Sequence, residues 1–164
     1  MNRHESQRGY FSFELYEQMK ENKDIVLITG DLGYRMFDSI RDDFPDRFFN
    51  VGASEQAMIG IAVGMSYEGK IPVVYSITNF LLYRPFEFIR NYIDKEKLHI
   101  ILAGGGRDKD YLHDGFTHWS QDAKQVLKCF PNIKQLWPES NEEAAIALDQ
   151  GLEEKSPLFI SLTR

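Results

Sequence analysis

The sequence contains a single cysteine, Cys129, so it has neither a disulfide framework nor a cluster of thiolate metal ligands. No stripe of Lys or Arg occurs, and the formal net charge of −6 argues against nucleic acid as a partner. No apolar run approaches the roughly 20 residues that a membrane span requires, and the polar start "MNRHESQRGY" does not resemble a signal peptide. We therefore expect a cytoplasmic protein with no membrane contact.

Repeats, low-complexity segments and linkers are also missing. A length of 164 residues, with 43% hydrophobic and 27% charged residues, suits one globular domain with a proper core. The sequence therefore predicts a single domain over residues 1–164.

Helix and strand signals alternate along the chain. Short apolar, β-branched runs predict strands at 24–31, 47–52, 71–77, 98–105, 133–138 and 157–164. Apolar residues at helical spacing predict helices at 12–22, 36–45, 54–69, 84–97, 120–130 and 140–155, the last capped by Ser140 or Asn141. This alternation predicts an α/β fold with three layers, in which helices cover both faces of a mostly parallel twisted sheet of about six strands.

Ligands of such sheets bind beyond the carboxyl ends of the strands. That rule selects the segments that begin at Gly30-Asp31, at Val51–Glu55, at Ser76–Phe80 and at Gly104–His118. The segment "GGGRDKD" at 104–110 lacks the Lys-Ser/Thr of a P-loop and the spacing of a dinucleotide fingerprint.

Glu55 stands where the third predicted helix begins, among small and apolar residues. One interpretation is a first-turn glutamate that meets the positive end of the helix. The other is a poorly hydrated carboxylate that is ready to hold a proton. Gly60 and Gly64, one turn apart on the same helix, either pack on their own sheet or permit a helix of another subunit to approach.

Three motifs carry a resemblance to a known family. The stretch "NVGASEQAMIGIAVGMSYEGKIPVVYSI" (50–77) resembles the pyrimidine-binding domain of transketolase-like, thiamine diphosphate-dependent enzymes. "NFLLYRPFEFIRN" (79–91) and "HDGFTHWSQD" (113–122) are similar to later motifs of the same family, in the same order. The likeness covers nearly the whole chain, from Asp24 to Arg164.

The resemblance implies a role for Glu55. In this family a carboxylate bonded to N1′ of the cofactor's aminopyrimidine favours the imino tautomer that removes the C2 proton of the thiazolium. The resemblance also places Phe80 and Tyr83 against the aminopyrimidine, for which the alternative is plain core packing. Asp31 matches an aspartate near the cofactor, for which the alternative is turn formation.

His118 matches a histidine that contacts the substrate near the reacting carbon, and His113 matches the family less closely in the same loop. The alternatives are solvated loop histidines or a histidine-pair metal site, and no third metal ligand is evident at suitable spacing. Arg107 stands near the place where transketolases carry a substrate-binding histidine, so it is a candidate for holding an anionic substrate group.

The Gly-Asp-Gly…Asn signature that binds Mg²⁺ and diphosphate in this family does not occur in the sequence, nor does a third domain. The resemblance therefore implies the small subunit of a split transketolase, which binds thiamine diphosphate together with a partner subunit that supplies the Mg²⁺ ligands, expected as α2β2. The expected reaction moves a two-carbon ketol unit from a ketose to an aldose, with small sugars or sugar phosphates as substrates. The alternatives are a β-type subunit of another thiamine diphosphate enzyme, such as a 2-oxoacid decarboxylase, dehydrogenase or synthase, and a non-catalytic binding domain.

Overall fold

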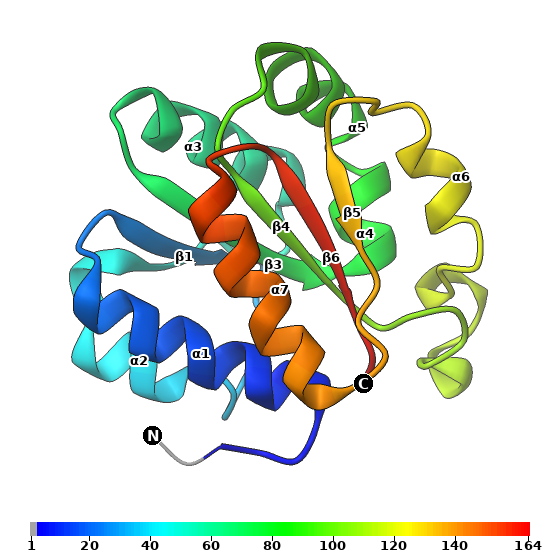
Figure 1. Ribbon diagram of the computed structural model, residues 1–164. Helices are drawn as coiled ribbons and strands as arrows, with labels where there is room; N and C mark the ends of the chain where they lie inside the picture. The colour runs from blue at the N-terminus through cyan, green and yellow to red at the C-terminus, as the bar shows by residue number, and fades with distance from the viewer. Residues whose placement is uncertain (1–2) are drawn as a thin grey trace.

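A six-stranded sheet forms the centre of the molecule in the computed structural model, which describes residues 3–164 (Figure 1). The strand order is β2-β1-β3-β4-β6-β5, and every neighbouring pair is parallel. The strands are β1 (Ile25–Thr29), β2 (Phe48–Asn50), β3 (Ile71–Ile77), β4 (Ile101–Gly105), β5 (Lys134–Leu136) and β6 (Leu158–Leu162). The predicted α/β fold with a sheet of about six strands is confirmed.

Helices cover both faces of the sheet, which makes three layers (Figure 1). The α-helices are α1 (Gln7–Glu21), α2 (Asp38–Asp43), α3 (Glu55–Tyr67), α4 (Thr78–Tyr83), α5 (Phe86–Phe88), α6 (Ala123–Leu127) and α7 (Asn141–Glu154). A π-helical turn spans Ile89–Asp94, and 3₁₀ turns span Pro45–Arg47, Leu112–Asp114 and Phe116–His118.

Two hydrophobic cores separate these layers. Helices α1, α2 and α7 pack on one face through fully buried side chains such as Phe11, Ile40 and Leu148. Helices α3, α4 and α6 pack on the other face through side chains such as Met58 and Leu81. All residues of β1, β4 and β6 are buried, as expected for parallel strands that are covered on both sides.

The helix predicted after β3 has the wrong bounds. The sequence predicted a helix over 84–97, but the helical segment begins at Thr78, directly after β3, and is interrupted between Tyr83 and Phe86. Pro85 explains the interruption, because it has no backbone N–H to donate and its ring clashes with the carbonyl of the preceding turn. The segment 78–83, to which the sequence analysis assigned neither helix nor strand, is therefore helical.

Caps determine the ends of the two longest helices. Helix α1 begins at Gln7 and not near residue 12, because the Ser6 side chain accepts a hydrogen bond from the backbone N–H of Gly9 at 3.1 Å. Helix α7 begins at Asn141, and Ser140 caps it by accepting from the backbone N–H of Glu143. The predicted cap at Ser140 is confirmed.

The strand order creates a topological switch point between β1 and β3. The chain leaves β1 toward β2 on one side and returns through α3 to β3 on the other side of β1. Helix α3 therefore begins beyond the carboxyl ends of these strands, in the crevice where open α/β sheets bind their ligands. Glu55 is its first residue.

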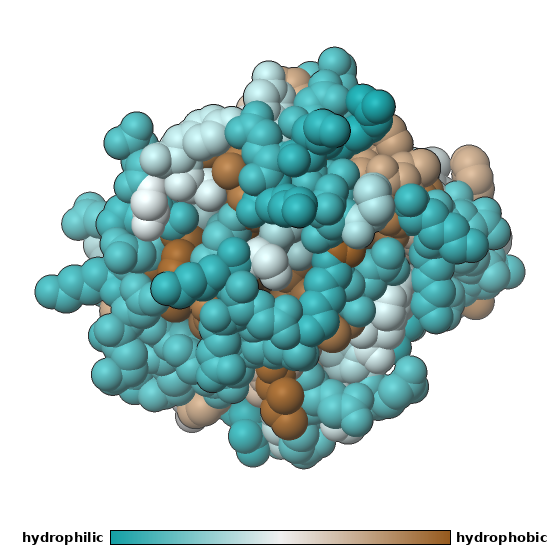
Figure 2. Space-filling view, turned by 45° about the horizontal axis from the view of Figure 1, so that its top comes forward, coloured by the Kyte–Doolittle hydropathy of each residue, from teal (hydrophilic) through white to brown (hydrophobic). Residues whose placement is uncertain are grey.

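The surface that Figure 2 turns toward the viewer is mostly hydrophilic, with hydrophobic residues exposed in small, separate patches. Within residues 3–164, no helix combines the length and the apolar character that crossing a bilayer would need.

Candidate active site

Glu55 is buried at the switch point, with 2% of its surface exposed. The Ser76 hydroxyl, from β3, donates a hydrogen bond to Glu55 Oε1 at 3.3 Å. Gly30 lies close to the same atom, since a Cβ there would lie 3.5 Å from Oε1. Glu55 is thus a first-turn residue of α3 and also a poorly hydrated carboxylate, and its readiness to hold a proton stays a prediction.

Arg84 provides the second partner of this carboxylate. Its Nη1 donates to Glu55 Oε2 at 2.7 Å, and its guanidinium carbon lies 3.9 Å from the centre of the Phe80 ring. Phe80 and Arg84 are four residues apart, so they lie on the same side of the helical segment that follows β3. The arginine thus bridges Glu55 and Phe80, two of the three residues that the sequence predicted around the aminopyrimidine.

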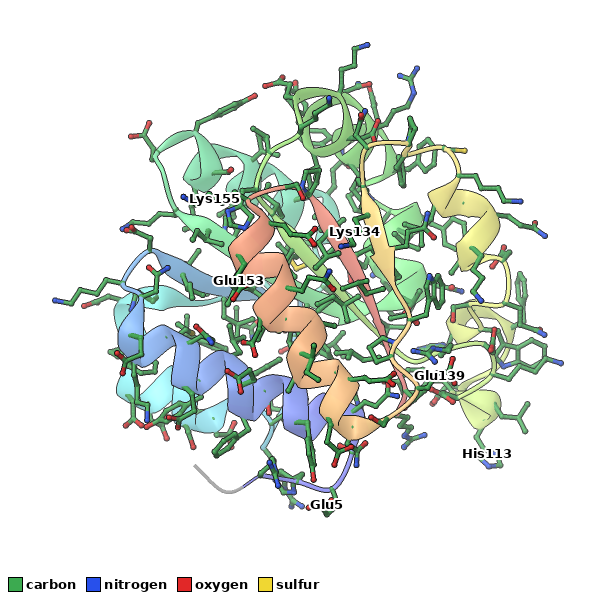
Figure 3. All side chains as sticks on the ribbon, viewed as in Figure 1. Glu5, His113, Lys134, Glu139, Glu153 and Lys155 are labelled. Carbon is green, nitrogen blue, oxygen red and sulfur yellow. The ribbon has the colours of Figure 1, made fainter. Side chains whose placement is uncertain are left out.

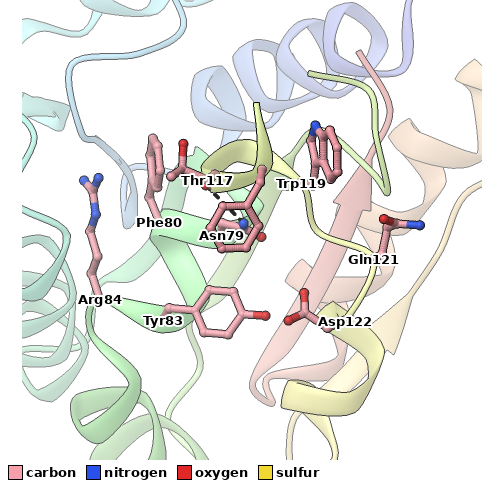
Figure 4. Close-up of a pocket in the computed structure, with 9 residues that line it drawn as sticks. Asn79, Phe80, Tyr83, Arg84, Thr117, Trp119, Gln121 and Asp122 are labelled. Carbon is pink, nitrogen blue, oxygen red and sulfur yellow. Dashed lines mark hydrogen bonds between the residues drawn. The ribbon is translucent and has the colours of Figure 1, made fainter. Parts of the chain in front are cut away.

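Two neighbouring cavities open around Arg84. One, of about 620 Å³, is lined by the start of α3 and includes Glu55. The other, of about 470 Å³, lies between α4 and the loop that precedes α6 and includes Phe80 and Tyr83 (Figure 4). Arg84 is the one residue that lines both cavities. Three of the sequence-predicted residues, Glu55, Phe80 and Tyr83, therefore line neighbouring cavities, with Arg84 at the boundary between them.

His118 lies beside Phe80. The centroids of the two rings are 4.9 Å apart, and the Tyr111 ring lies 6.2 Å from His118. Thr117 Oγ1 and His118 Nδ1 are hydrogen-bonded at 3.0 Å, which leaves Nε2 as the nitrogen that is available to a ligand. Asn79 Nδ2 donates to the Thr117 carbonyl at 3.1 Å and ties the histidine loop to α4 (Figure 4).

Tyr83 lines the α4 cavity, and 39% of its surface is exposed. Partial burial of the hydroxyl raises its pKa well above the ordinary tyrosine value, and the nearby Asp122 carboxylate raises it further. The Tyr83 hydroxyl thus keeps its proton and faces Asp122 across this cavity.

Asp31 stands in the turn that follows β1, with a left-handed backbone at φ 61°. Its Oδ1 accepts hydrogen bonds from Tyr34 Oη at 2.5 Å and from Asn50 Nδ2 at 3.4 Å, and these two bonds lower the pKa of the carboxyl. The structure thus shows Asp31 in a turn-forming role, and its contact with a cofactor stays a prediction.

Arg107 is tied to the protein itself. Its Nη2 donates to the carbonyls of Pro138 and Ser161 at 2.9 and 2.6 Å, and its Nε donates to Ser161 Oγ at 3.1 Å. These bonds join the loop after β4 to β6 and to the segment after β5. The predicted contact with a substrate anion stays a prediction, for which Nη1 is the nitrogen that remains.

His113 is exposed on the outer side of its loop, where it points away from the body of the protein (Figure 3). The residues that line the two cavities around Arg84 do not include it. Its predicted contact with substrate therefore depends on a ligand or a chain that reaches beyond these cavities. Within residues 3–164, no group of three or more His, Cys, Asp or Glu side chains could hold a metal ion.

A third cavity, of about 450 Å³, lies beside the turn of Asp31 and carries positive charge. Arg8 and Arg35 line it together with His4 and Tyr34. Arg8 Nη1 donates to Tyr111 Oη at 3.4 Å, and Arg8 Nε is buried without a hydrogen-bond partner among residues 3–164. Through Tyr111 this cationic cavity adjoins the His118 loop.

Gly60 and Gly64 lie on the outer side of α3. A Cβ on Gly60 would lie 3.4 Å from the Phe88 ring of the same chain, whereas a Cβ on Gly64 would meet no heavy atom within 4 Å. Gly60 thus makes room for a neighbour within the chain, and the predicted subunit contact stays a prediction for Gly64.

The sequence analysis missed Arg84, Ser76 and the cationic cavity. The spacing of four residues between Phe80 and Arg84 could have indicated that their side chains are neighbours, but only if the segment after β3 had been predicted as a helix. Ser76 was noted only as a strand end. Arg8 and Arg35 are far apart in sequence, and no local pattern joins them.

Comparisons with known proteins agree with these features. The model of the family described as "Transketolase, pyrimidine binding domain" matches residues 6–164. The chain is 31% identical over 120 residues to one of the subunits of apulose-4-phosphate transketolase from Actinobacillus succinogenes, covering 73% of this chain and 39% of the relative. It is 30% identical over 154 residues to 1-deoxy-D-xylulose-5-phosphate synthase from Treponema pallidum, covering 92% of this chain and 24% of the relative.

Solved structures give the same result. A structure described as a split gene transketolase in an inactive β4 tetramer aligns with a TM-score of 0.85 and 29% identity, over 97% of this chain and 51% of that one. The transketolase from Leishmania mexicana has the same fold, with a TM-score of 0.86 at 19% identity over 99% of this chain and 26% of that one. The chain spans about half or less of the length of these relatives. Because the family model matches almost the whole chain, the protein belongs to the family of transketolase pyrimidine-binding domains.

Proposed function

We propose that this chain is the pyrimidine-binding subunit of a thiamine diphosphate-dependent, transketolase-like enzyme that transfers a two-carbon ketol unit from a ketose to an aldose. The observation that carries the proposal is the buried carboxylate of Glu55 at the start of α3, with the Phe80 ring and His118 nearby. When bound, thiamine diphosphate supplies the carbon nucleophile of the reaction.

The residues present fit the pyrimidine half of this cofactor. A buried carboxylate oxygen can share a proton with a ring nitrogen, and in a site with little water such a hydrogen bond is strong. The faces of Phe80 and Tyr83 suit a flat heteroaromatic ring, and both residues line one cavity. Glu55 would hold the proton at the ring nitrogen, and the two aromatic side chains would orient the ring.

His118 would act on the substrate in this proposal. Its Nδ1 is held by Thr117, so Nε2 would donate a proton to a substrate oxygen or accept one from it. The cationic cavity of Arg8 and Arg35 would bind a phosphate group at the far end of the sugar, since planar guanidinium groups match phosphate oxygens well. Two relatives whose names contain sugar phosphates support this choice of substrate.

A separate subunit would complete the site by holding the diphosphate and Mg²⁺. Three observations support this part of the proposal. Aromatic side chains are exposed around the site, with Tyr34 70% and Phe116 80% exposed. The name of the relative from Actinobacillus describes it as one subunit of a transketolase, and the solved split gene transketolase is an inactive β4 tetramer. We propose an α2β2 assembly in the cytoplasm, with this chain as a single domain over residues 1–164.

The proposal is tested by Glu55→Gln in the complete complex. Glutamine keeps the size of the side chain but cannot exchange a proton with the ring nitrogen, so we expect the C2 proton of bound thiamine diphosphate to exchange about 10²–10⁴-fold more slowly. Assembly of the subunits should be unchanged, as judged by analytical ultracentrifugation. Proton exchange at the wild-type rate would refute the role of Glu55.

The requirement for a partner is tested with the pure chain. We expect weak binding of thiamine diphosphate and no ketol transfer, because the groups that hold the diphosphate would be absent. Tight binding that depends on Mg²⁺ would contradict the division into two subunits.

The similarity to a synthase over 92% of this chain favours one other reaction for the same cofactor. A subunit that acts on a 2-oxoacid would release labelled carbon dioxide from a carboxyl-labelled substrate, whereas ketol transfer releases none. The same complex, offered a ketose and a 2-oxoacid in turn, separates the two candidates.

A further inference from the structure

Arg84 contacts two of the three residues that the proposed function assigns to the cofactor ring, Glu55 and Phe80. It donates to Glu55 Oε2 at 2.7 Å, and its guanidinium carbon lies 3.9 Å from the centre of the Phe80 ring. We propose that Arg84 is a gate: in the free chain its guanidinium occupies the recognition surface for the aminopyrimidine, and its side chain swings outward when the ring binds. This inference rests on the proposed function of the site.

The shape of the site supports the gate. Glu55 and Phe80 line two different cavities, and Arg84 is the one residue that belongs to both. A single flat ring that contacts Glu55 and Phe80 together must therefore take the place that the guanidinium holds. Movement of Arg84 would join the two cavities into one slot.

The chemistry of the guanidinium explains why it can stand in for the ring. Both groups are flat and both stack on an aromatic face. The guanidinium donates an N–H to the carboxylate, and the ring nitrogen of an aminopyrimidine forms its hydrogen bond there through a proton that it shares with Glu55. Arg84 thus satisfies the same two contacts that an aminopyrimidine would make. A ring that enters replaces each contact with an equivalent one.

The burial of Glu55 couples the outward movement of Arg84 to the binding of the ring. The Glu55 side chain is 1% exposed, and Arg84 and Ser76 are its hydrogen-bond partners within residues 3–164. If Arg84 left alone, the carboxylate would lose its charged hydrogen-bond partner, which is costly for a buried charge. The Arg84 side chain is 46% exposed and regains water when it moves outward. The gate therefore opens when a ring takes over its hydrogen bond to Glu55, and stays closed otherwise.

The full chain and a fragment of the cofactor provide the test. The probe is 4-amino-2-methylpyrimidine, which carries the ring without the diphosphate, and binding is measured by NMR titration. Arg84→Met keeps the apolar stem of the side chain and removes the guanidinium. We expect this variant to bind the probe at least roughly 5-fold more tightly than the wild type, as expected when a competing internal group is lost.

Arg90→Met is the matched control. Arg90 is exposed on the π-helical turn that follows α5, and its Nη1 donates to its neighbour Asn91. The Arg90→Met variant should bind the probe with the same affinity as the wild type. The double variant Glu55→Gln/Arg84→Met should lose the gain in affinity, since it lacks the carboxylate for which the ring and Arg84 compete.

A second measurement needs no variant. The Nε–H resonance of Arg84 in the wild-type chain should move toward the position of a solvated arginine as the probe is added. Equal affinity of wild type and Arg84→Met, or a bound probe with an unchanged Arg84 resonance, would overturn the gate and leave the proposed function standing. If neither protein bound the probe, the gate in the free chain would be overturned, and the proposed function would still be decided by proton exchange in the complete complex.

Discussion

The His118 and Phe80 rings meet nearly edge to face, with an angle of 69° between their planes. Phe80 comes from α4, and His118 comes from the 3₁₀ turn in the loop that follows β4. One aromatic side chain thus adjoins both the partner of Glu55 and the histidine that we propose to act on the substrate.

Phe80→Leu should disturb this arrangement. The loss of an aromatic pair costs about 0.5–1.5 kcal/mol beyond the lost burial, so we expect a lower free energy of unfolding in urea. The ring protons of His118 should also shift in the NMR spectrum, because they lose the ring current of Phe80. Urea unfolding reports the stability of the protein, and the NMR shift reports the position of His118 relative to residue 80.

Phe86→Leu is the control for that substitution. Phe86, on α5, is partly buried against the core, and its ring lies 4.9 Å from the Phe130 ring. Among the described residues, the ring that contacts His118 from this helical segment is that of Phe80. Phe86→Leu should destabilise the protein while leaving the resonances of His118 in place. A shift of His118 in both variants would mean that the loop responds to core packing in general.

His118→Ala and His113→Ala should differ in their effect on the rate. His118 is held beside Phe80 with Nε2 available, whereas His113 is exposed on the outer side of the loop (Figure 3). In the complete complex we expect a loss of about 10²-fold in kcat/KM for His118→Ala, and a much smaller loss for His113→Ala. Equal losses would show that His113 also contacts the substrate.

The sequence was sufficient for the architecture because each central strand is buried on both faces. Such strands are short runs of apolar residues, as in "IVLIT" of β1, and the helices between them have their own period. The broken helix after β3 was harder to predict. Thr78–Tyr83 is short, and its burial against β4 and α6 is a tertiary effect that local preference does not report.

The candidate site divides in the same way. Glu55, Phe80 and His118 could be selected from motifs, because each stands at a fixed place relative to a strand end. Arg84 could not, since its pairing with Glu55 depends on where α3 and α4 lie in space. The internal hydrogen bonds of Arg107 to Ser161 likewise join segments that only the fold brings together.

Asp149 should make stability depend on pH. It lies on α7 near Glu14 of α1, and Gln18 Nε2 donates to both carboxylates, at 2.9 Å to Asp149 and 3.0 Å to Glu14. Burial raises the pKa of Asp149 from 3.8 to about 6, and repulsion by Glu14 adds to the shift. Because the folded state binds this proton more tightly than the unfolded state, the contribution is complete below pH 3.8 and is lost as the pH rises through 6.

Asp149→Asn removes the charge and keeps the shape. We expect the variant to be more stable than the wild type at pH 8, with a gain that shrinks steadily as the pH falls from 6 to 4, as measured by urea unfolding at each pH. Glu14→Gln should reproduce part of the gain, since it removes the repulsion. A gain that did not change with pH would exclude titration of Asp149 as its source.

Gly151 and Gly64 are both within helices but have opposite surroundings. A Cβ on Gly151 of α7 would lie 2.4 Å from Leu158 Cδ2 and 3.1 Å from Ile101 Cδ1, so α7 could not keep its distance from the sheet. We expect Gly151→Ala to lower the free energy of unfolding by about 1–3 kcal/mol. Gly64→Ala on α3 should instead raise it by roughly 0.5–1 kcal/mol, because alanine favours the helix and meets no neighbour.

Gly64 also tests whether the exposed side of α3 is a subunit contact. If a partner helix packs there, a large side chain must keep it away without harming the fold, since the position is open in the chain itself. We expect Gly64→Leu to be at least as stable as the wild type in urea, since leucine also favours the helix, but to weaken assembly with the partner subunit in sedimentation experiments. Assembly of wild-type strength in Gly64→Leu would show that the contact lies elsewhere, and the small residue at 64 would then have no role in association.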